Sequence, residues 1–384
     1  MGHSVHPTAR RWLGALAAAG TLAAAAPAIA ADLPIAQVAP LSGPLTPTGT
    51  HLRAGAQLYF DAVNAGGGIH GNKLTLLSRD DGYKAAETVR QVRELLRESQ
   101  PLALFGIVGT GNVEALLKEK LLDEAGVPLI TVRTGASTVV NSGNPWLFAT
   151  RASYAAEIEK IVQQYETIGY RRFAVFYQND PFGLDGLASA EATIKKAGGT
   201  LVAKAGYEKN TTDVAAAVKA IAAAGAQAVI MVSNTAASAE FVKQSRAVGN
   251  LAQFVALSVT DGPQVAEKIG KETAKGLAIT QVVPDPNARA IPLIREIQEN
   301  FARFKPQGVT LNHTLIEGYL GAKILGEGLR RAGPNPTRKK LRDALEQIRD
   351  YDIGGQYISY SAANHIGADY VDITILNKDG KLLR

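Results

Sequence analysis

Six short loops rich in glycine, serine, threonine and asparagine carry the side chains best suited to bind a ligand. Each loop follows an apolar run of strand length, and ligands of open α/β sheets bind beyond the carboxyl ends of the strands. Glycine lets a ligand approach the backbone, while hydroxyl groups and free amides at a helix start can hold a carboxylate. The same residue types cap ordinary helices, so the prediction of a binding site depends on several loops converging. These loops span residues 40–43, 106–111, 134–137, 178–182, 233–235 and 258–261.

No residue pattern indicates catalysis or a metal site. The chain has no cysteine, which excludes disulfides, thiolate metal ligands and a cysteine-linked lipid anchor. It has no P-loop, HExxH or GxSxG motif, and the glycine loop 106–111 lacks the spacing of a dinucleotide fingerprint. We therefore expect no catalytic residue, no metal and no cofactor. A secreted α/β hydrolase is the alternative from another functional class. The histidines beyond the N-terminal segment show no ligand spacing, namely His51, His70, His313 and His365.

The elements that must position these loops alternate between strand and helix patterns. Apolar runs at 35–38, 73–78, 102–106 and 127–132 alternate with helical patterns, and a second series of strands follows at 173–177, 200–205, 228–232 and 254–257. Such alternation predicts βαβ units with parallel sheets covered on both faces. The predicted fold class is therefore α/β, with two doubly wound parallel-sheet lobes.

The late part of the chain predicts a hinge of several strands. Helical patterns at 288–304 and 311–331, a helix after Pro336, and short strands at 356–360 and 370–376 follow the second series. A chain that returns to both lobes makes a hinge rather than a simple linker. We assign residues 32–150 plus 282–350 to lobe 1 and residues 151–281 plus 351–384 to lobe 2.

The first thirty-one residues read as a secretory signal peptide. Arg10 and Arg11 precede an apolar run at 12–26, and Ala28-Ile29-Ala30 forms a small-x-small cleavage site. The apolar run is shorter than the roughly 20 residues that span a bilayer. We expect a mature protein that begins at Ala31 or Asp32 and is released into the periplasm without a lipid anchor.

The charge pattern argues against nucleic acid as a partner. The net charge is +6, but basic and acidic residues are interspersed, and no basic block contains interleaved aromatic residues.

The order and spacing of several motifs resemble one known family. The motifs are PLSG (40–43), AVNAGGGIHG (62–71), DDGYKAAETV (80–89), AGVPLI (125–130), TGAS (134–137) and YQNDPFG (177–183). Together they resemble the type I periplasmic solute-binding proteins of ABC transporters, in the leucine/isoleucine/valine-binding (branched-chain amino acid) group, over essentially the whole mature chain.

The resemblance implies a monomeric receptor without enzymatic activity, which closes two lobes on a small ligand and presents it to the ABC permease membrane subunits. It also implies that the first lobe fixes a ligand carboxylate and that an aromatic residue of the second lobe closes over the ligand. The matching carboxylate donors are Thr110, Gly135, Ala136 and Ser137, and the matching aromatic residue is Phe182. Residues in or near the same motifs and loops complete the expected site, namely Ser42, Tyr83, Gly109, Tyr154 and Asn234.

One departure from the family pattern concerns the ligand ammonium. Amino-acid binders of this type usually carry an acidic residue after the third strand of the second lobe, but the matching segment 234–238 reads NTAAS. Asp261, one loop further, is the candidate replacement. We favour an aliphatic (branched-chain) amino acid as the ligand, with an aromatic or short aliphatic carboxylate that lacks an ammonium as the alternative. The sequence does not separate transport from delivery of the ligand to a membrane sensor.

Overall fold

The computed structural model describes residues 1–4 and 32–384. Apart from residues 1–4, the predicted signal peptide at 1–31 lies outside the described residues. No helix in the described part of the chain has both the length and the apolar character needed to cross a bilayer.

Five parallel strands form a first sheet in the order β2-β1-β3-β4-β5. Helices cover both of its faces, and we call this body the first lobe. Its strands are β1 (Asp32–Ala39), β2 (Lys73–Asp80), β3 (Ala103–Phe105), β4 (Leu129–Ile130) and β5 (Leu147–Phe148). The helices of this part of the chain are α1 (Thr46–Ala65), α2 (Ala85–Glu98), α3 (Thr110–Lys118), α4 (Leu121–Ala125) and α5 (Ser137–Val140).

A second sheet of seven strands, in the order β14-β13-β10-β9-β8-β6-β7, forms the second lobe. Strand β8 is buried at all five residues, as expected for a parallel strand with helices on both faces. Strands β13 and β14 join antiparallel at one edge. The strands are β6 (Arg172–Gln178), β7 (Thr200–Tyr207), β8 (Ala228–Val232), β9 (Gln253–Ala256), β10 (Ala278–Gln281), β13 (Asp372–Leu376) and β14 (Leu382–Leu383). The helices are α6 (Tyr154–Thr167), α7 (Pro181–Lys196), α8 (Ala215–Ala223), α9 (Thr235–Ala247), α10 (Gly262–Ile269) and α11 (Lys271–Ala274).

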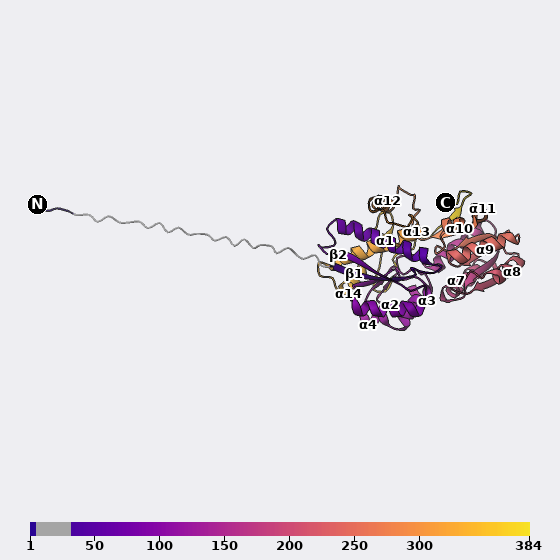
Figure 1. Cartoon of the computed structure of the whole chain (residues 1–384), viewed down its shortest axis with the longest axis horizontal. Coiled ribbons are helices and arrows are strands. Elements are labelled where there is room, and N and C mark those ends of the chain that lie inside the picture. The colour runs from indigo at the N-terminus through magenta and orange to yellow at the C-terminus, as the bar shows by residue number, and fades with distance from the viewer. Residues whose placement is uncertain (5–31) are drawn as a thin grey trace.

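Figure 1 shows the two lobes side by side, with α1, α2 and α14 on one body and α7 to α11 on the other. The chain crosses between the lobes three times, after β5, after β10 and before β13. This architecture confirms the predicted fold class of two α/β lobes on doubly wound parallel sheets. The helical pattern between the predicted strands at 102–106 and 127–132 forms two helices, α3 and α4, because Lys120 adopts a left-handed backbone (φ 51°) between them.

The segment between the second and third crossings packs on the first lobe. It contains α12 (Pro292–Phe304), α13 (His313–Ala332), α14 (Arg338–Leu345) and the hairpin of β11 (Tyr351–Asp352) and β12 (Tyr357–Ile358). Ile353, Ile358 and Tyr360 are buried in the same core as strand β1. Residues 351–368 therefore pack on the first lobe, whereas the sequence assigned them to lobe 2. Burial of these apolar side chains holds the hairpin on the first lobe.

Two glycines allow α1 and α13 to cross closely in the first lobe. A Cβ atom on Gly55 would lie 2.0 Å from the carbonyl oxygen of Leu315, and one on Gly318 would lie 2.1 Å from that of Leu52. Both distances are far below a normal contact, and in each case the obstacle is backbone. The close crossing buries most of α13, whose first turn reaches the boundary between the lobes.

We expect Gly318→Ala to lower the free energy of unfolding by about 1–3 kcal/mol, because the added methyl group must push the two helices apart. Urea denaturation would measure the loss. The matched control is Gly66→Ala, since Gly66 has φ −87° and its Cβ would lie 3.4 Å from the nearest atom. Equal stability of the Gly318 and Gly66 variants would contradict this account of the crossing.

Candidate functional site

The strand-end loops of the two lobes face each other and enclose a small cavity, which we call the front pocket. Its volume is about 30 Å³, room for roughly two water molecules. The lobes are therefore nearly closed on each other in this structure. The pocket is lined by Leu45, Thr48, Tyr83, Val108, Gly109, Arg133, Tyr154, Phe182, Asn234 and Val259.

Five of the predicted site residues line the front pocket: Tyr83, Gly109, Tyr154, Phe182 and Asn234. Gly109 precedes α3 with φ 101°, and a Cβ there would lie 2.5 Å from the Tyr83 ring. Phe182 lies in the first turn of α7, and its ring centroid is 5.1 Å from that of Tyr154 at the start of α6. The pocket therefore has aromatic walls from both sides of the cleft.

A hydrogen-bonded group of polar side chains supports the second-lobe wall. Asn234 donates through Nδ2 to Gln178 Oε1 and to the Tyr207 hydroxyl, both at 3.1 Å, and the Tyr207 hydroxyl donates to Gln178 Oε1 at 3.0 Å. Gln178 Nε2 reaches the Tyr83 hydroxyl of the first lobe at 3.3 Å. Burial raises the pKa of Tyr83 and of Tyr207, and that of Tyr154 to about 12. All three are neutral phenols near pH 7.

The predicted carboxylate donors of the first lobe are already engaged within the chain. The hydroxyl groups of Thr110 and Thr134 lie 2.7 Å apart, and the Ala136 amide donates to Thr134 Oγ1 at 3.2 Å. Gly135 accepts from the Tyr154 amide through its carbonyl oxygen at 2.8 Å. None of the four predicted donors, Thr110, Gly135, Ala136 and Ser137, lines the front pocket.

Ser137 binds a carboxylate of the protein itself. Its amide donates to Asp185 Oδ1 of the second lobe at 2.9 Å, and its hydroxyl donates to the same oxygen. The other oxygen, Asp185 Oδ2, is buried and accepts no hydrogen bond from the part of the chain that the structure describes. The contact joins the start of α5 to the α7 face, one turn beyond Phe182. Asp185 therefore binds the Ser137 donors that the family resemblance assigns to a ligand carboxylate.

A second contact between the lobes comes from Lys209. Its ammonium donates to Asn112 Oδ1 at 3.1 Å and lies 3.9 Å from the centroid of the Tyr83 ring. Asp180 Oδ2 is 3.7 Å away. Burial lowers the pKa of Lys209, against the opposing effect of Asp180 and Asp81. Lys209 of the second lobe therefore helps to hold the first lobe closed.

Two further predicted site residues, Ser42 and Asp261, also do not line the front pocket. Ser42 is exposed and donates its amide to Asp80 Oδ1 at 3.2 Å. Asp261 caps α10 by accepting from the Gln264 amide at 3.0 Å, and its Oδ2 accepts from Asn312 Nδ2 at 2.8 Å. Its carboxylate is therefore occupied by a helix cap and by a bond to the first lobe.

Behind the front pocket, four buried charges tie the lobes together, and we call Arg133, Arg151, Glu157 and Glu317 the hinge network. Glu317 accepts from Arg133 through one oxygen and from Arg151 at 3.3 Å through the other. Arg151 also donates to Glu157 at 2.8 Å. Burial alone would lower the pKa of Arg151, but Glu317 and Glu157 raise it above its ordinary value. The two positive and two negative charges balance, as buried charges require.

Sequence reasoning missed Arg133, which belongs to both the hinge network and the wall of the front pocket. It directly precedes the TGAS motif in the loop after β4, so its place in a strand-end loop was the available signal.

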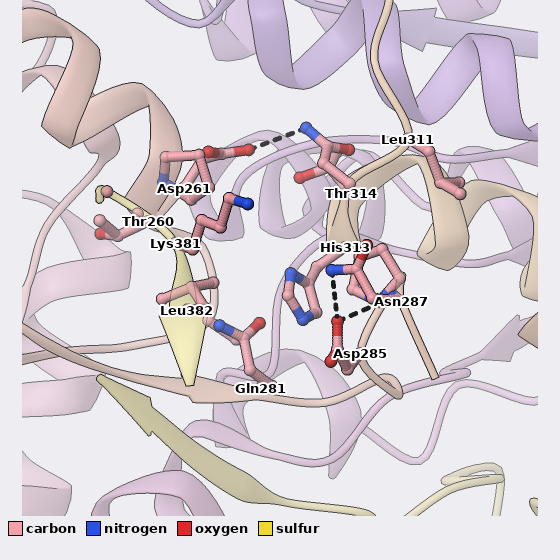
Figure 2. A pocket seen from close by; sticks show the side chains of 16 residues that line it. Thr260, Asp261, Gln281, Asp285, Asn287, Leu311, His313, Thr314, Lys381 and Leu382 are labelled. Carbon is pink, nitrogen blue, oxygen red and sulfur yellow. Dashed lines mark hydrogen bonds between the residues drawn. The ribbon is translucent and has the colours of Figure 1, made fainter. Parts of the chain in front are cut away.

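A second and larger cavity, which we call the hinge cavity, lies beside the crossing after β10. Its volume is about 180 Å³, and Asp261 is one of the residues that line it. Figure 2 shows side chains from both lobes pointing into it. Asp261 and Asn312, which are joined by a hydrogen bond, are both among the residues that line it. Among the described residues, no group of three or more histidine, aspartate or glutamate side chains is placed to hold a metal ion.

Comparison with known proteins gives consistent results. The family described as periplasmic binding protein matches residues 32–381. A crystal structure of a substrate-binding periplasmic protein from Ralstonia solanacearum is 38% identical, with a TM-score of 0.88, and the match covers 92% of this chain and 99% of that one. An extracellular ligand-binding receptor from Verminephrobacter eiseniae is 30% identical, with a TM-score of 0.85 and coverage of 92% and 100%. The Leu/Ile/Val-binding protein homolog 7 of Brucella suis biovar 1 (strain 1330) is 25% identical over 333 residues, 83% of this chain and 81% of that protein.

Proposed function

The chain belongs to the periplasmic binding protein family, and we propose that it captures a small carboxylate in the front pocket and presents it to the permease of an ABC importer. The two-lobed fold and the likeness to a substrate-binding periplasmic protein support this role. Because the family consists of binding proteins, the prediction that the chain is not an enzyme is confirmed, and the hydrolase alternative is set aside. The signal-like residues 1–31 and the family support a periplasmic location.

The charge of the front pocket carries the proposal for the ligand class. Among the described residues that line the pocket, Arg133 alone is charged and none is a carboxylate. Because Arg133 is already paired with Glu317, the ligand class follows from the missing carboxylate and not from a net positive charge. Asp261, the expected ammonium partner, faces the hinge cavity instead. A buried ammonium without a counter-charge is costly, so this pocket favours the alternative ligand class, a carboxylate without an ammonium. The names of the Brucella relatives point the other way, towards aliphatic amino acids.

The side chains that line the front pocket indicate the shape of the uncharged part of the ligand, which we call its body. The rings of Tyr83, Tyr154 and Phe182 face it, and aromatic groups pack with each other in offset or edge-to-face arrangements. The volume of about 30 Å³ is too small for such a ligand, so the lobes must separate slightly to admit it. We therefore favour a carboxylate with an aromatic or other planar apolar body.

A matched pair of ligands tests this proposal, namely 3-phenylpropionate and L-phenylalanine, which differ only by the ammonium group. We expect calorimetry on refolded, ligand-free protein to detect binding of 3-phenylpropionate. Phe182→Leu should weaken that binding by about 2- to 12-fold, because an aromatic contact contributes about 0.5–1.5 kcal/mol beyond its buried area.

Tyr357→Leu is the control, because Tyr357 is exposed and lies outside the pocket. Binding of L-phenylalanine that is lost in the Phe182 variant would show that the front pocket accepts an ammonium and would restore the amino-acid assignment.

A further inference from the structure

The hinge cavity has the size and the walls of a ligand site. At about 180 Å³ it exceeds an engineered cavity of roughly 150 Å³ that binds benzene. Its walls come from the start of α10 and the C-terminal hairpin in the second lobe, from the start of α13 in the first lobe, and from the crossing after β10. The cavity therefore depends on how the two lobes are placed.

Three side chains that project into the hinge cavity have unused hydrogen-bonding capacity (Figure 2). Nε2 of His313 is buried and has no hydrogen-bond partner among the described residues. Burial lowers the pKa of His313 to about 4, so the ring is neutral near pH 7. Lys381 is an exposed residue at the edge of the cavity, and its ammonium makes no hydrogen bond or ion pair with the described residues. Asp285 uses one oxygen to accept from the amide and the side chain of Asn287, and its other oxygen remains available.

The positions of these charges decide which ligand fits. In Figure 2 the Lys381 ammonium and the Asp285 carboxylate lie on different sides of the His313 ring. A simple carboxylate could pair with Lys381 but would meet the negative charges of Asp285 and Asp261, and a simple amine would meet the positive charge of Lys381. A molecule with one positive and one negative group can pair with both Asp285 and Lys381. Such a molecule also gives His313 Nε2 a polar neighbour.

We infer that the hinge cavity is a second ligand site, separate from the front pocket, and that it takes a small zwitterion with one ammonium and one carboxylate. The carboxylate pairs with Lys381, and the ammonium pairs with Asp285 beside His313. Because both lobes contribute walls, an occupant stabilises the closed arrangement. By linkage, the zwitterion and the front-pocket ligand then increase each other's affinity.

The experiment uses L-alanine as the probe, with propionate and ethylamine as probes that each carry one of its two charges. We expect calorimetry to detect L-alanine and to find weaker binding of both single-charge probes. Lys381→Met and Asp285→Asn should each weaken L-alanine binding about tenfold or more, as expected when a hydrogen bond to a charged group is removed.

The controls separate this site from the front pocket. Lys378→Met changes an exposed lysine of the same hairpin that does not line the cavity, and it should leave L-alanine binding unchanged. Saturating 3-phenylpropionate should not displace L-alanine, because the two ligands occupy different cavities. Thermal unfolding of each variant verifies that it folds.

Three results would overturn the inference. They are the absence of L-alanine binding, L-alanine binding that survives both Lys381→Met and Asp285→Asn, and propionate binding as tight as that of L-alanine. Each of them leaves the proposed role of the front pocket intact, because that role is tested with other ligands and with Phe182.

Discussion

Replacing Glu317 by glutamine should lower the free energy of unfolding by about 3–5 kcal/mol, the usual loss when one partner of a buried ion pair is removed. Glu317 accepts from both Arg133 and Arg151, and the three side chains are no more than 6% exposed. Glutamine has the same shape but no charge, so Arg133 would lose its ion pair, and Arg151 would keep its ion pair with Glu157. Urea denaturation followed by circular dichroism would measure the loss.

The matched control for this prediction is Glu327→Gln on the same helix. Glu327 pairs with Arg330 and Arg331 near the surface, and such pairs contribute about 1 kcal/mol or less. Similar losses for the two variants would mean that the hinge network is not the stabilising unit described above. A loss confined to Glu317→Gln would identify the buried charges as the connection between the lobes.

The sequence was sufficient to predict the features of the fold that depend on local patterns. The run AVIMV of β8 is apolar at every position, and a strand buried on both faces requires that composition. The strand-end rule also pointed to the loops of Gly109, Phe182 and Asn234, which line the front pocket; their contact with a ligand stays a prediction. The fold class was confirmed, and the parallel order of strands, once inferred, brings their carboxyl ends to one edge.

The other features of the candidate site depend on contacts between segments that are far apart in sequence. No local sequence pattern encodes such contacts. Ser137 and Asp185 are 48 residues apart, Asp261 and Asn312 are 51 apart, and Arg133 and Glu317 are 184 apart. Asp261 was a reasonable ammonium partner from its loop alone, but its own helix and Asn312 use its oxygens. The alternation of strand and helix also could not tell which lobe would bury Tyr360, because both lobes offer an apolar surface.

The Ser137–Asp185 contact has a consequence for ligand affinity. The amide and hydroxyl of Ser137 are donors that the family resemblance assigns to a ligand carboxylate, and in this structure Asp185 Oδ1 uses both. If the ligand carboxylate binds at Ser137, it must first displace Asp185, whose like charge also opposes an anion nearby. The contact would then act as an internal competitor of the ligand.

We therefore predict that Asp185→Ala raises the affinity for 3-phenylpropionate by about 10- to 100-fold. Hydrogen bonds to charged groups contribute roughly 1.5–3 kcal/mol, and each 1.4 kcal/mol corresponds to about a factor of ten in affinity. The same change removes a contact between the lobes, so small-angle X-ray scattering should find the ligand-free variant more open. Calorimetry on both proteins measures the change in affinity.

Two further variants show whether the gain in affinity arises at Ser137. Glu191→Ala changes a residue of the same helix that pairs with Lys204 on the surface of the second lobe, and it should leave the affinity unchanged. Adding Ser137→Ala to Asp185→Ala should remove much of the gain, because the freed hydroxyl is then missing. Weaker binding by Asp185→Ala alone would instead mean that the contact persists in the liganded form and holds the lobes closed around the ligand.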